Sequence, residues 1–304
     1  MPQTSAQWAE ALAPGIREWF SIGYQNRPSL ISQFFNVQTS ENAEESFYSF
    51  GAVAPDAWDE YERTGIVPKV GFDKGYKTTI THKEYPLEMD IQRKLIDDNK
   101  YANVVDLATQ MGSSAALKRE KDAASVFINS ASSSFVGGDA VALCSNSHPY
   151  SPTKSATTQD NYDALTLTAT NVETIRQKMR AVKDDTGNLA GVNPDLLIVA
   201  DGGTLENDAK IITQTDGKVG SADNDVNVQK GRFGYVVHPY LTSATQWFMA
   251  DSRMMKQSLF WFDRSNLNIK LKDGQDTTLF STWIGYMRYG FGWRDWRWIN
   301  QGNA

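Results

Sequence analysis

The chain has 304 residues, of which 40% are hydrophobic and 22% are charged, a composition typical of folded proteins rather than disordered ones. Its formal net charge of −6 excludes an overall positive field that would draw the chain to nucleic acid or anionic lipid. A single cysteine, Cys144, excludes an internal disulfide framework, and the absence of any apolar run of about 18 residues excludes an obvious membrane-spanning helix.

Residues 1–45 are rich in aromatic side chains but follow no sustained strand or helix period. Acids and Trp stand where a signal peptide would be apolar, so we expect synthesis and assembly in a cytoplasm. The pattern predicts an extended arm with one short helical piece. Because such an arm has little core of its own, its aromatic residues are expected to pack on another subunit. The candidate contacts are Trp8, Trp19, Phe20, Phe34 and Phe35.

Residues 67–84 consist of two β-rich runs around Asp73-Lys74-Gly75, a turn cluster that predicts a hairpin. Both faces of this hairpin are only modestly apolar, so it would be marginal if it stood alone. We therefore expect it to lie across a neighbouring subunit, with Phe72, Tyr76 and Ile80 as the candidate contacts.

Helical spacing dominates from Leu87 to Asn129. Leu87, Ile91 and Leu95 are spaced by four and predict a first helix, and an apolar row across 102–129 predicts a second, long one. Gly112 weakens the second helix locally, at about 1 kcal/mol relative to Ala. The charged run 118–122 is interpreted as a solvated face, and the whole helix as a strut.

Residues 130–161 are rich in Ser, Thr, Gly and Pro and are expected to be loops. A helix is predicted over 171–182 with Asn171 as its N-cap, a buried strand over 194–200, and another helix over 204–213. Together these make an α+β unit that is distinct from the strut.

The segment 214–230 is polar, contains two glycines and has no apolar period, which predicts an exposed loop. Its charged residues are Asp216, Lys218, Asp223, Asp225 and Lys230. Strand-like segments follow at 235–241, 246–249, 257–263 and 268–272. The aromatic segment 282–299 closes the chain, and the alternation in Trp296-Arg297-Trp298 predicts a strand.

Catalytic chemistry has little support in the sequence. The three histidines, His82, His148 and His238, are scattered and none lies near Cys144, so no metal site is predicted. The paired acids lack the ligand pattern of a calcium loop, and no Gly-x-Ser-x-Gly segment supports a serine nucleophile. Cys144 is expected to be a small buried residue. We predict no catalytic residue, no cofactor and no metal, and therefore not an enzyme.

Several short stretches nevertheless occur in a recognisable order: 85–90, 97–98, 138–149, 171–179 leading to 193–199, and 288–297. From about Glu84 onward the chain resembles the major capsid (head) proteins of tailed bacteriophages, in particular the Mu-like major head subunit family. That resemblance implies the capsid fold of the lambdoid Hong Kong phage, an α+β fold with an N-terminal arm, an extended β-hairpin loop, a peripheral domain with a long spine helix and an axial α+β domain. The implied divisions are 1–45 for the arm, 46–85 for the extended hairpin loop, 86–160 for the peripheral domain, 161–262 for the axial domain and 263–304 for C-terminal strands that return between the two domains.

The function implied by the resemblance is that of a structural subunit, which assembles as hexamers and pentamers into an icosahedral shell around packaged DNA. The implied location is the virion, after assembly in the host cytoplasm. Implied partners are further copies of the chain, a separate scaffolding protein, a portal and a decoration protein, with weak non-specific DNA contact at most and no membrane. The polar loop 214–230 is expected near the symmetry axis of each capsomer. Two alternatives remain open: an encapsulin-like cellular nanocompartment shell, and an unrelated α+β enzyme.

Overall fold

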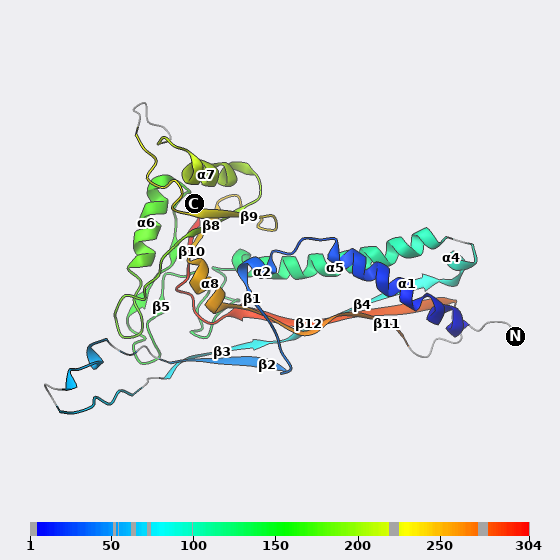
Figure 1. The fold of residues 1–304 in the computed structure, drawn as a ribbon, viewed down its shortest axis with the longest axis horizontal. Coiled ribbons are helices and arrows are strands. Elements are labelled where there is room, and N and C mark those ends of the chain that lie inside the picture. Colours follow the sequence, from blue (N-terminus) through cyan, green and yellow to red (C-terminus); the bar gives the residue numbers. More distant parts are fainter. Residues whose placement is uncertain are drawn as a thin grey trace.

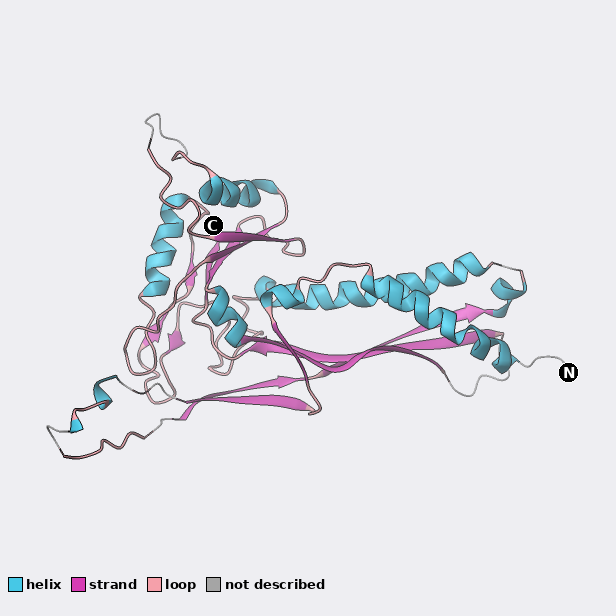
Figure 2. Cartoon of the chain, in the orientation of Figure 1, coloured by secondary structure: helices cyan, strands magenta, loops and turns pink. Residues whose placement is uncertain are grey.

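The computed structural model describes residues 5–50, 53, 55–61, 65–71, 74–98, 100–218, 225–272 and 279–303. The molecule is elongated, with a bar of two long helices on a long sheet, a compact lobe at one end of the bar and a hairpin that projects beyond the same end (Figure 1). Figure 2 shows that helices and strands are mixed in both the bar and the lobe.

The helices run in chain order as α1 (Ser5–Gln25), α2 (Ile31–Phe34), the 3-10 helix η1 (Pro55–Ala57), α4 (Arg93–Asp97), α5 (Tyr101–Ile128), α6 (Ala169–Arg180), α7 (Gly203–Gln214) and α8 (Ser252–Ser258). The strands are β1 (Asn36–Thr39), β2 (Glu44–Phe50), β3 (Lys74–Thr81), β4 (Lys83–Gln92), β5 (His148–Pro149), β6 (Thr158–Gln159), β7 (Tyr162–Asp163), β8 (Leu196–Ala200), β9 (Gly234–His238), β10 (Gln246–Ala250), β11 (Leu259–Leu271), β12 (Phe280–Trp293) and β13 (Ile299–Asn303). No described helix is both long and apolar enough to cross a bilayer.

The bar is a four-stranded sheet in the order β1-β11-β12-β4, with β1 parallel to β11 and the other pairs antiparallel. The helix predicted from Leu87 to Leu95 is wrong, because β4 pairs with β12 over ten residues there and only Arg93–Asp97 is helical. A spacing of four fits both a helix and one face of a strand. The long partner strand β12 decides between the two.

Helix α5 is the predicted strut, and its observed bounds, Tyr101–Ile128, lie within one residue of the prediction. The charged run within it is not a solvated face throughout, since Arg119 is 8% exposed and Glu120 is 3% exposed. Arg119 lies over the rings of Trp261 and Tyr289 and forms an ion pair with Asp263 at 2.9 Å. A buried pair of this kind is compensated by the sheet, which the sequence of the helix does not reveal.

The N-terminal arm is not extended, which corrects the prediction, because α1 is a helix of 21 residues that lies along α5. Ile16 and Phe20 are buried in a core shared with Val104, Met111 and Trp283. Pro14 lies inside the helix and interrupts the apolar pattern, so the sequence pattern did not predict a helix of this length.

Phe34 and Phe35 of the arm also lie inside the subunit. Phe34 is 1% exposed and meets Phe127 at 5.4 Å between ring centroids, and Phe35 is 2% exposed and meets Trp261 at 5.8 Å. Lys256 Nζ donates to the carbonyl oxygens of Ser32 and Phe35 and holds this segment on α8. The arm therefore has an intramolecular partner surface, contrary to the expectation that another subunit supplies it.

The compact lobe is built on a five-stranded sheet in the order β7-β13-β10-β8-β9, with α6 and α7 beside it. Strand β8 lies in the interior of this sheet, as predicted. Helices α6 and α7 each begin within two residues of the predicted first residue. The N-cap of α6 is Thr168, not Asn171: the Thr168 hydroxyl accepts a hydrogen bond from Asn171 N. The predicted strand at Trp296-Arg297-Trp298 is a turn instead, and β13 begins at Ile299.

The hairpin pairs β2 with β3 in antiparallel register, from Glu44 opposite Thr81 to Phe50 opposite Lys74. Lys74 and Gly75 belong to β3, so the turn predicted there is wrong. The hairpin is longer than the sequence pattern indicated, because its first strand comes from 44–50.

Helices α1 and α5 cross at two glycines. A Cβ on Gly112 would overlap the carbonyl oxygen of Phe20, and a Cβ on Gly23 would overlap the carbonyl oxygen of Thr109.

We predict that Gly112→Ala lowers the free energy of unfolding by about 1–3 kcal/mol, although Ala is the better helix former, because the two backbones must separate. Urea unfolding of the purified subunit measures the change. Gly15→Ala in α1 is the control, since its Cβ would meet only the Trp19 side chain, and it is expected to be neutral or stabilising. Equal stability of Gly112→Ala and the wild type would contradict the close crossing.

His238, at the end of β9, is 1% exposed and stacks on Phe34 at 5.3 Å. Burial lowers the pKa of His238 to about 4. Between pH 6.5 and 4 the unfolded chain therefore binds a proton that the folded chain does not, and stability falls as the pH falls through that window. The loss attributable to this residue reaches about 3 kcal/mol. We predict that His238→Gln is less sensitive than the wild type between pH 7 and pH 4 in urea unfolding. Parallel pH profiles for the two proteins would show that His238 does not carry the effect.

Candidate subunit interfaces

The hairpin is anchored at its root by an aromatic stack. Phe47 of β2 lies 4.9 Å from the Phe260 ring and 5.9 Å from the Phe262 ring, and Ile80 of β3 is 4% exposed in the same cluster. Ile80 was predicted as an inter-subunit contact, but its side chain is covered by its own chain. The root is therefore part of the subunit core, and only the more distant part of the hairpin is free to meet a neighbour.

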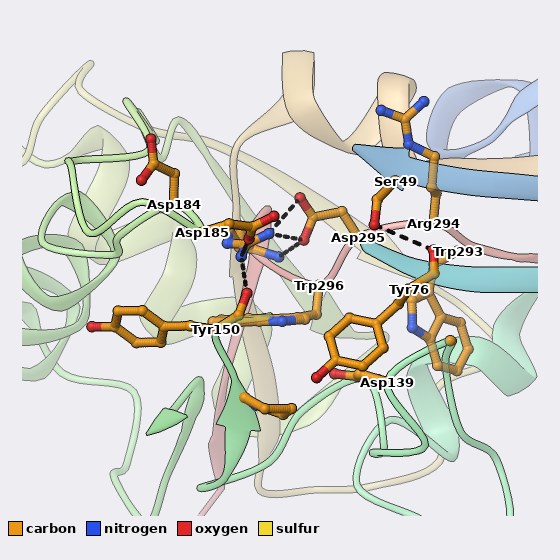
Figure 3. A pocket seen from close by; sticks show the side chains of 13 residues that line it. Ser49, Tyr76, Asp139, Tyr150, Asp184, Asp185, Trp293, Arg294, Asp295 and Trp296 are labelled. Atoms are coloured by element: carbon orange, nitrogen blue, oxygen red, sulfur yellow. Dashed lines mark hydrogen bonds and ion pairs between the residues drawn. The ribbon is translucent and has the colours of Figure 1, made fainter. Parts of the chain in front are cut away.

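A polar cleft of about 210 Å3 lies where the hairpin, the end of β12 and the lobe meet (Figure 3). Tyr76 of the hairpin points into it, near Asp139, so this predicted contact residue faces its own subunit as well. Burial is the main cause that raises the pKa of Tyr76, and Asp139 adds to it. Asp139 itself accepts a 2.8 Å hydrogen bond from Nδ1 of the buried His148, and the His148 ring stacks on Trp296 at 4.1 Å.

Arg297 joins the walls of this cleft. Its guanidinium donates to Asp185 at 2.6 Å, to Asp295 at 3.2 Å and to the carbonyl oxygens of Tyr150 and Lys183. Burial raises the pKa of Asp185, and Arg297 offsets this only in part. The charges of Arg297, Asp185 and Asp295 are therefore paired within the chain, and Arg297 joins the segments that hold Tyr150, Lys183 and Asp185 to the end of the chain.

The hairpin connection, described here over 53, 55–61 and 65–71, lies at the far end of the hairpin (Figure 1). Several of its large apolar side chains are exposed. Trp58 is 87% exposed, Ile66 69% and Val67 71%. Apolar groups this exposed on a projecting segment indicate a contact surface. The sequence prediction missed these residues, although the run Ile66-Val67-Pro68 was a visible signal.

An apolar groove of about 300 Å3 lies elsewhere, between α5 and the β4–β12 edge of the sheet. Leu87, which is 53% exposed, lines it together with Met111 and Gly285. Glu84 and Lys118 stand among its lining residues. The hairpin connection of the same chain points away from this groove, so the two surfaces do not meet within one subunit (Figure 1).

The polar loop at 214–230 pairs its own charges. Lys230 forms an ion pair with Asp216, Lys218 lies 3.9 Å from Asp225, and Gly217 and Val226 form a β-bridge. Asn227 Nδ2 donates to the carbonyl oxygens of Ile212 and Thr215, which fixes the base of the loop on α7. The acids described here therefore have cationic partners before any neighbour is added.

The structure does not describe the side chains of three predicted contact residues. Phe72 and Asp223 lie outside the described residues, and of Trp8 only the backbone, in α1, is described. Trp19 lies partly buried beside the core of α1 and α5. The structure thus turns Phe20, Phe34, Phe35 and Ile80 from candidate contacts into core residues.

The described side chains that could bind a metal or act as a nucleophile are not clustered. Among the described residues no group of three or more His, Cys, Asp or Glu is placed to hold a metal ion. Cys144 is 1% exposed, and burial raises the pKa of its thiol. A thiol of this kind is a packing residue and a poor nucleophile.

Comparison with known proteins gives a consistent result. A family model described as phage capsid protein matches residues 76–299. A chain of the bacteriophage JBD30 procapsid is 13% identical, with a TM-score of 0.55, and the match covers 99% of this chain and 76% of that one. The JBD30 capsid gives 16% identity and a TM-score of 0.57 over 71% of this chain and 92% of that one.

A virus-like particle from Pyrococcus furiosus also has this fold, at 13% identity and a TM-score of 0.53 over 95% of this chain and 98% of that one. No curated protein sequence matches significantly. At these identities the solved structures show the fold alone, and they confirm the predicted α+β capsid fold.

We predict that Arg297→Lys lowers the free energy of unfolding by about 2 kcal/mol, because an ammonium group cannot hold two carboxylates and two carbonyls in the planar fork that Arg provides. Thermal unfolding of the purified subunit measures it. Arg294→Lys is the matched control, since Arg294 is exposed in the same cleft and its side chain has no hydrogen bond or ion pair with the described residues. A similar small change in both variants would show that the Arg297 bonds contribute nothing particular.

Proposed function

Because this chain belongs to the phage capsid protein family, matched over residues 76–299, we propose that it assembles as hexamers and pentamers into an icosahedral head shell around packaged DNA. The chain is a structural shell subunit and not an enzyme, and its place is the virion. The finer likeness, to the Mu-like head subunits with the lambdoid Hong Kong phage plan, is part of the proposal. The family supports a phage head over a cellular nanocompartment.

The proposed assembly mode is supported by two apolar surfaces that lie apart on the chain, the hairpin connection and the α5–β4 groove. Their separation supports a contact in which the hairpin connection of one subunit meets the groove of the next. Such a heterologous contact repeats from subunit to subunit and closes into a ring when the rotation allows it.

The two sheets support the proposed domain plan. The α1–α5 bar with its four-stranded sheet is the proposed peripheral domain, and the five-stranded lobe is the proposed axial domain. Strands β11 and β12 lie in the first sheet and β13 in the second, which supports the idea that the C-terminal strands return between the two. The hairpin 46–85 is the proposed extended loop. Within the proposed arm 1–45, the described residues form α1, α2, β1 and the start of β2 and pack on their own chain rather than extending freely.

The loop 214–230 is proposed to lie at the capsomer axis, at the end of the lobe. Within one chain Lys230 forms an ion pair with Asp216, and Lys218 lies 3.9 Å from Asp225. With intramolecular partners, several copies can approach one axis at little electrostatic cost.

Further partners are proposed from the family resemblance and the charge. A separate scaffolding protein, a portal and a decoration protein would complete the head, and assembly would take place in the host cytoplasm. The net charge of −6 supports enclosure of the DNA with weak non-specific contact at most, and no membrane contact is proposed.

Electron microscopy of the purified chain tests the function, with closed shells as the expected result. We predict that Ile66→Ser with Val67→Ser leaves the subunit folded, as judged by its thermal unfolding, but lowers the yield of shells at least tenfold, because the apolar contact is lost. Leu189→Ser, an equally exposed site at 67%, is the control and should assemble normally. Full assembly of the double variant would remove the hairpin connection as an interface, and a wild-type chain that forms only small oligomers would overturn the shell function itself.

A further inference from the structure

The four-stranded sheet of the bar has one face under the helices and one face turned away from them. Helices α1 and α5 lie on the same side of this sheet (Figure 1). Tyr289 of β12 donates its hydroxyl to Asp122 of α5, so Tyr289 faces the helix. Because side chains alternate along a strand, Arg288 and Tyr286 face the other side, which we call the outer face.

Two arginines on the outer face are incompletely paired. Arg264 of β11 has no hydrogen bond or ion pair with the described residues, and its Nε atom is buried without an acceptor. The Nε atom of Arg288 is also buried without a hydrogen-bond acceptor, and its ion pair with Glu84 is long, at 3.9 Å. A buried guanidinium N–H without an acceptor is unfavourable in the free subunit.

The local charge on this face is positive. Burial is the main cause that raises the pKa of the Tyr286 hydroxyl; its hydrogen bond to Glu84 and the charge of Glu84 add to this effect, while Arg288 and Arg264 oppose it. Two cations and one acid therefore act on Tyr286, with a sum of +1. The Glu84 side chain is 59% exposed, so water screens it and it offsets little of the arginine charge.

The donors select a carboxylate, since two guanidinium groups present N–H donors that match its two oxygens. Exposed acids of this kind, Asp59 and Glu60, follow Trp58 in the hairpin connection. Glu84 lines the α5–β4 groove and pairs with Arg288, so the arginines border the surface proposed to receive that connection. A phosphate of the packaged DNA has similar chemistry, but the net charge of −6 disfavours its approach.

We propose that Arg264 and Arg288 bind the carboxylates of Asp59 and Glu60 from the hairpin connection of the next copy. The inference rests on the proposed contact between that connection and the groove, and adds a charged part to an apolar contact. The connection then crosses the sheet edge at β4, with its apolar residues in the groove and its acids on the outer face. Both arginines gain acceptors only in the shell.

The first test is Arg264→Gln, which removes a charge that has no partner in its own chain. The isolated subunit is expected to unfold at the wild-type temperature or slightly above it, while the critical concentration for shell assembly, followed by light scattering, rises about tenfold. Lys270→Gln, at an exposed cation on the same strand, is the control and should change neither quantity.

The second test identifies the occupant by exchange of charge. Arg264→Glu is expected to raise the critical concentration about tenfold or more, because like charges then face each other. Asp59→Lys or Glu60→Lys in the same chain should restore assembly to within about threefold of the wild type. Glu18→Lys, at an exposed acid on α1, changes the net charge equally and should not restore it.

Each other outcome overturns the proposal. An unchanged critical concentration for Arg264→Gln excludes the contact, and a defect of Arg264→Glu that neither lysine variant repairs excludes the hairpin connection as the occupant. A loss of subunit stability in Arg264→Gln as large as the loss of assembly means that the arginine acts within its own chain. If that variant forms empty shells normally but retains less DNA, the occupant is the packaged DNA.

Failure of the proposed function has a different signature. Absence of shells from the wild-type chain overturns the shell function, and full assembly of Ile66→Ser with Val67→Ser overturns the contact of the hairpin connection. Normal wild-type shells, a defect in that double variant and no effect of Arg264→Gln overturn the arginine contact alone.

Discussion

Arg119 is the point at which the long helix is fastened to the long sheet. Its guanidinium lies over the rings of Trp261 and Tyr289 and pairs with Asp263, while Trp261 Nε1 donates to the same carboxylate at 2.9 Å. Tyr289 donates its hydroxyl to Asp122, one turn further along α5, at 2.7 Å. A buried cation is tolerated only where its partners are fixed, so this network sets both the height and the register of α5 over β11 and β12.

The rest of the bar is built on that position. Helix α1 can approach α5 closely because glycines stand at the crossing, and Ile16 and Phe20 then close a core over Trp283. The segment that follows α1 passes over the other end of α5, where Phe34 and Phe35 enter the core that joins the bar to the lobe. The described residues from α1 to Phe35 are thus a structural part of the subunit.

The proposed apolar contact surfaces have one physical property in common, which is that they are costly to leave exposed to water. The hairpin connection exposes apolar side chains without a local core, and the groove beside β4 offers an apolar recess. Each is unfavourable in a free subunit, and each is of a kind that a neighbouring chain can satisfy. A shell protein needs this balance, since subunits too well satisfied alone would gain little by assembling.

The sequence by itself determined the elements whose pattern is local and uninterrupted. The apolar row of α5, the buried run of β8, the flanking helices α6 and α7 and the polar loop after α7 were all predicted near their observed positions, and the order of short motifs pointed to the capsid fold.

Tertiary structure decided the elements that depend on distant partners. Leu87 and Ile91 fit a helix or a strand until β12 pairs with them, and the helix around Pro14 is stabilised by packing on α5 rather than by its own pattern. Arg119 and Glu120 look like solvated charges because their local sequence is polar, and only the sheet and the crossing segment bury them. The same holds for Phe34 and Phe35. Their aromatic side chains indicate that they pack on some surface. Which chain supplies that surface depends on contacts far away in sequence, which local spacing does not encode.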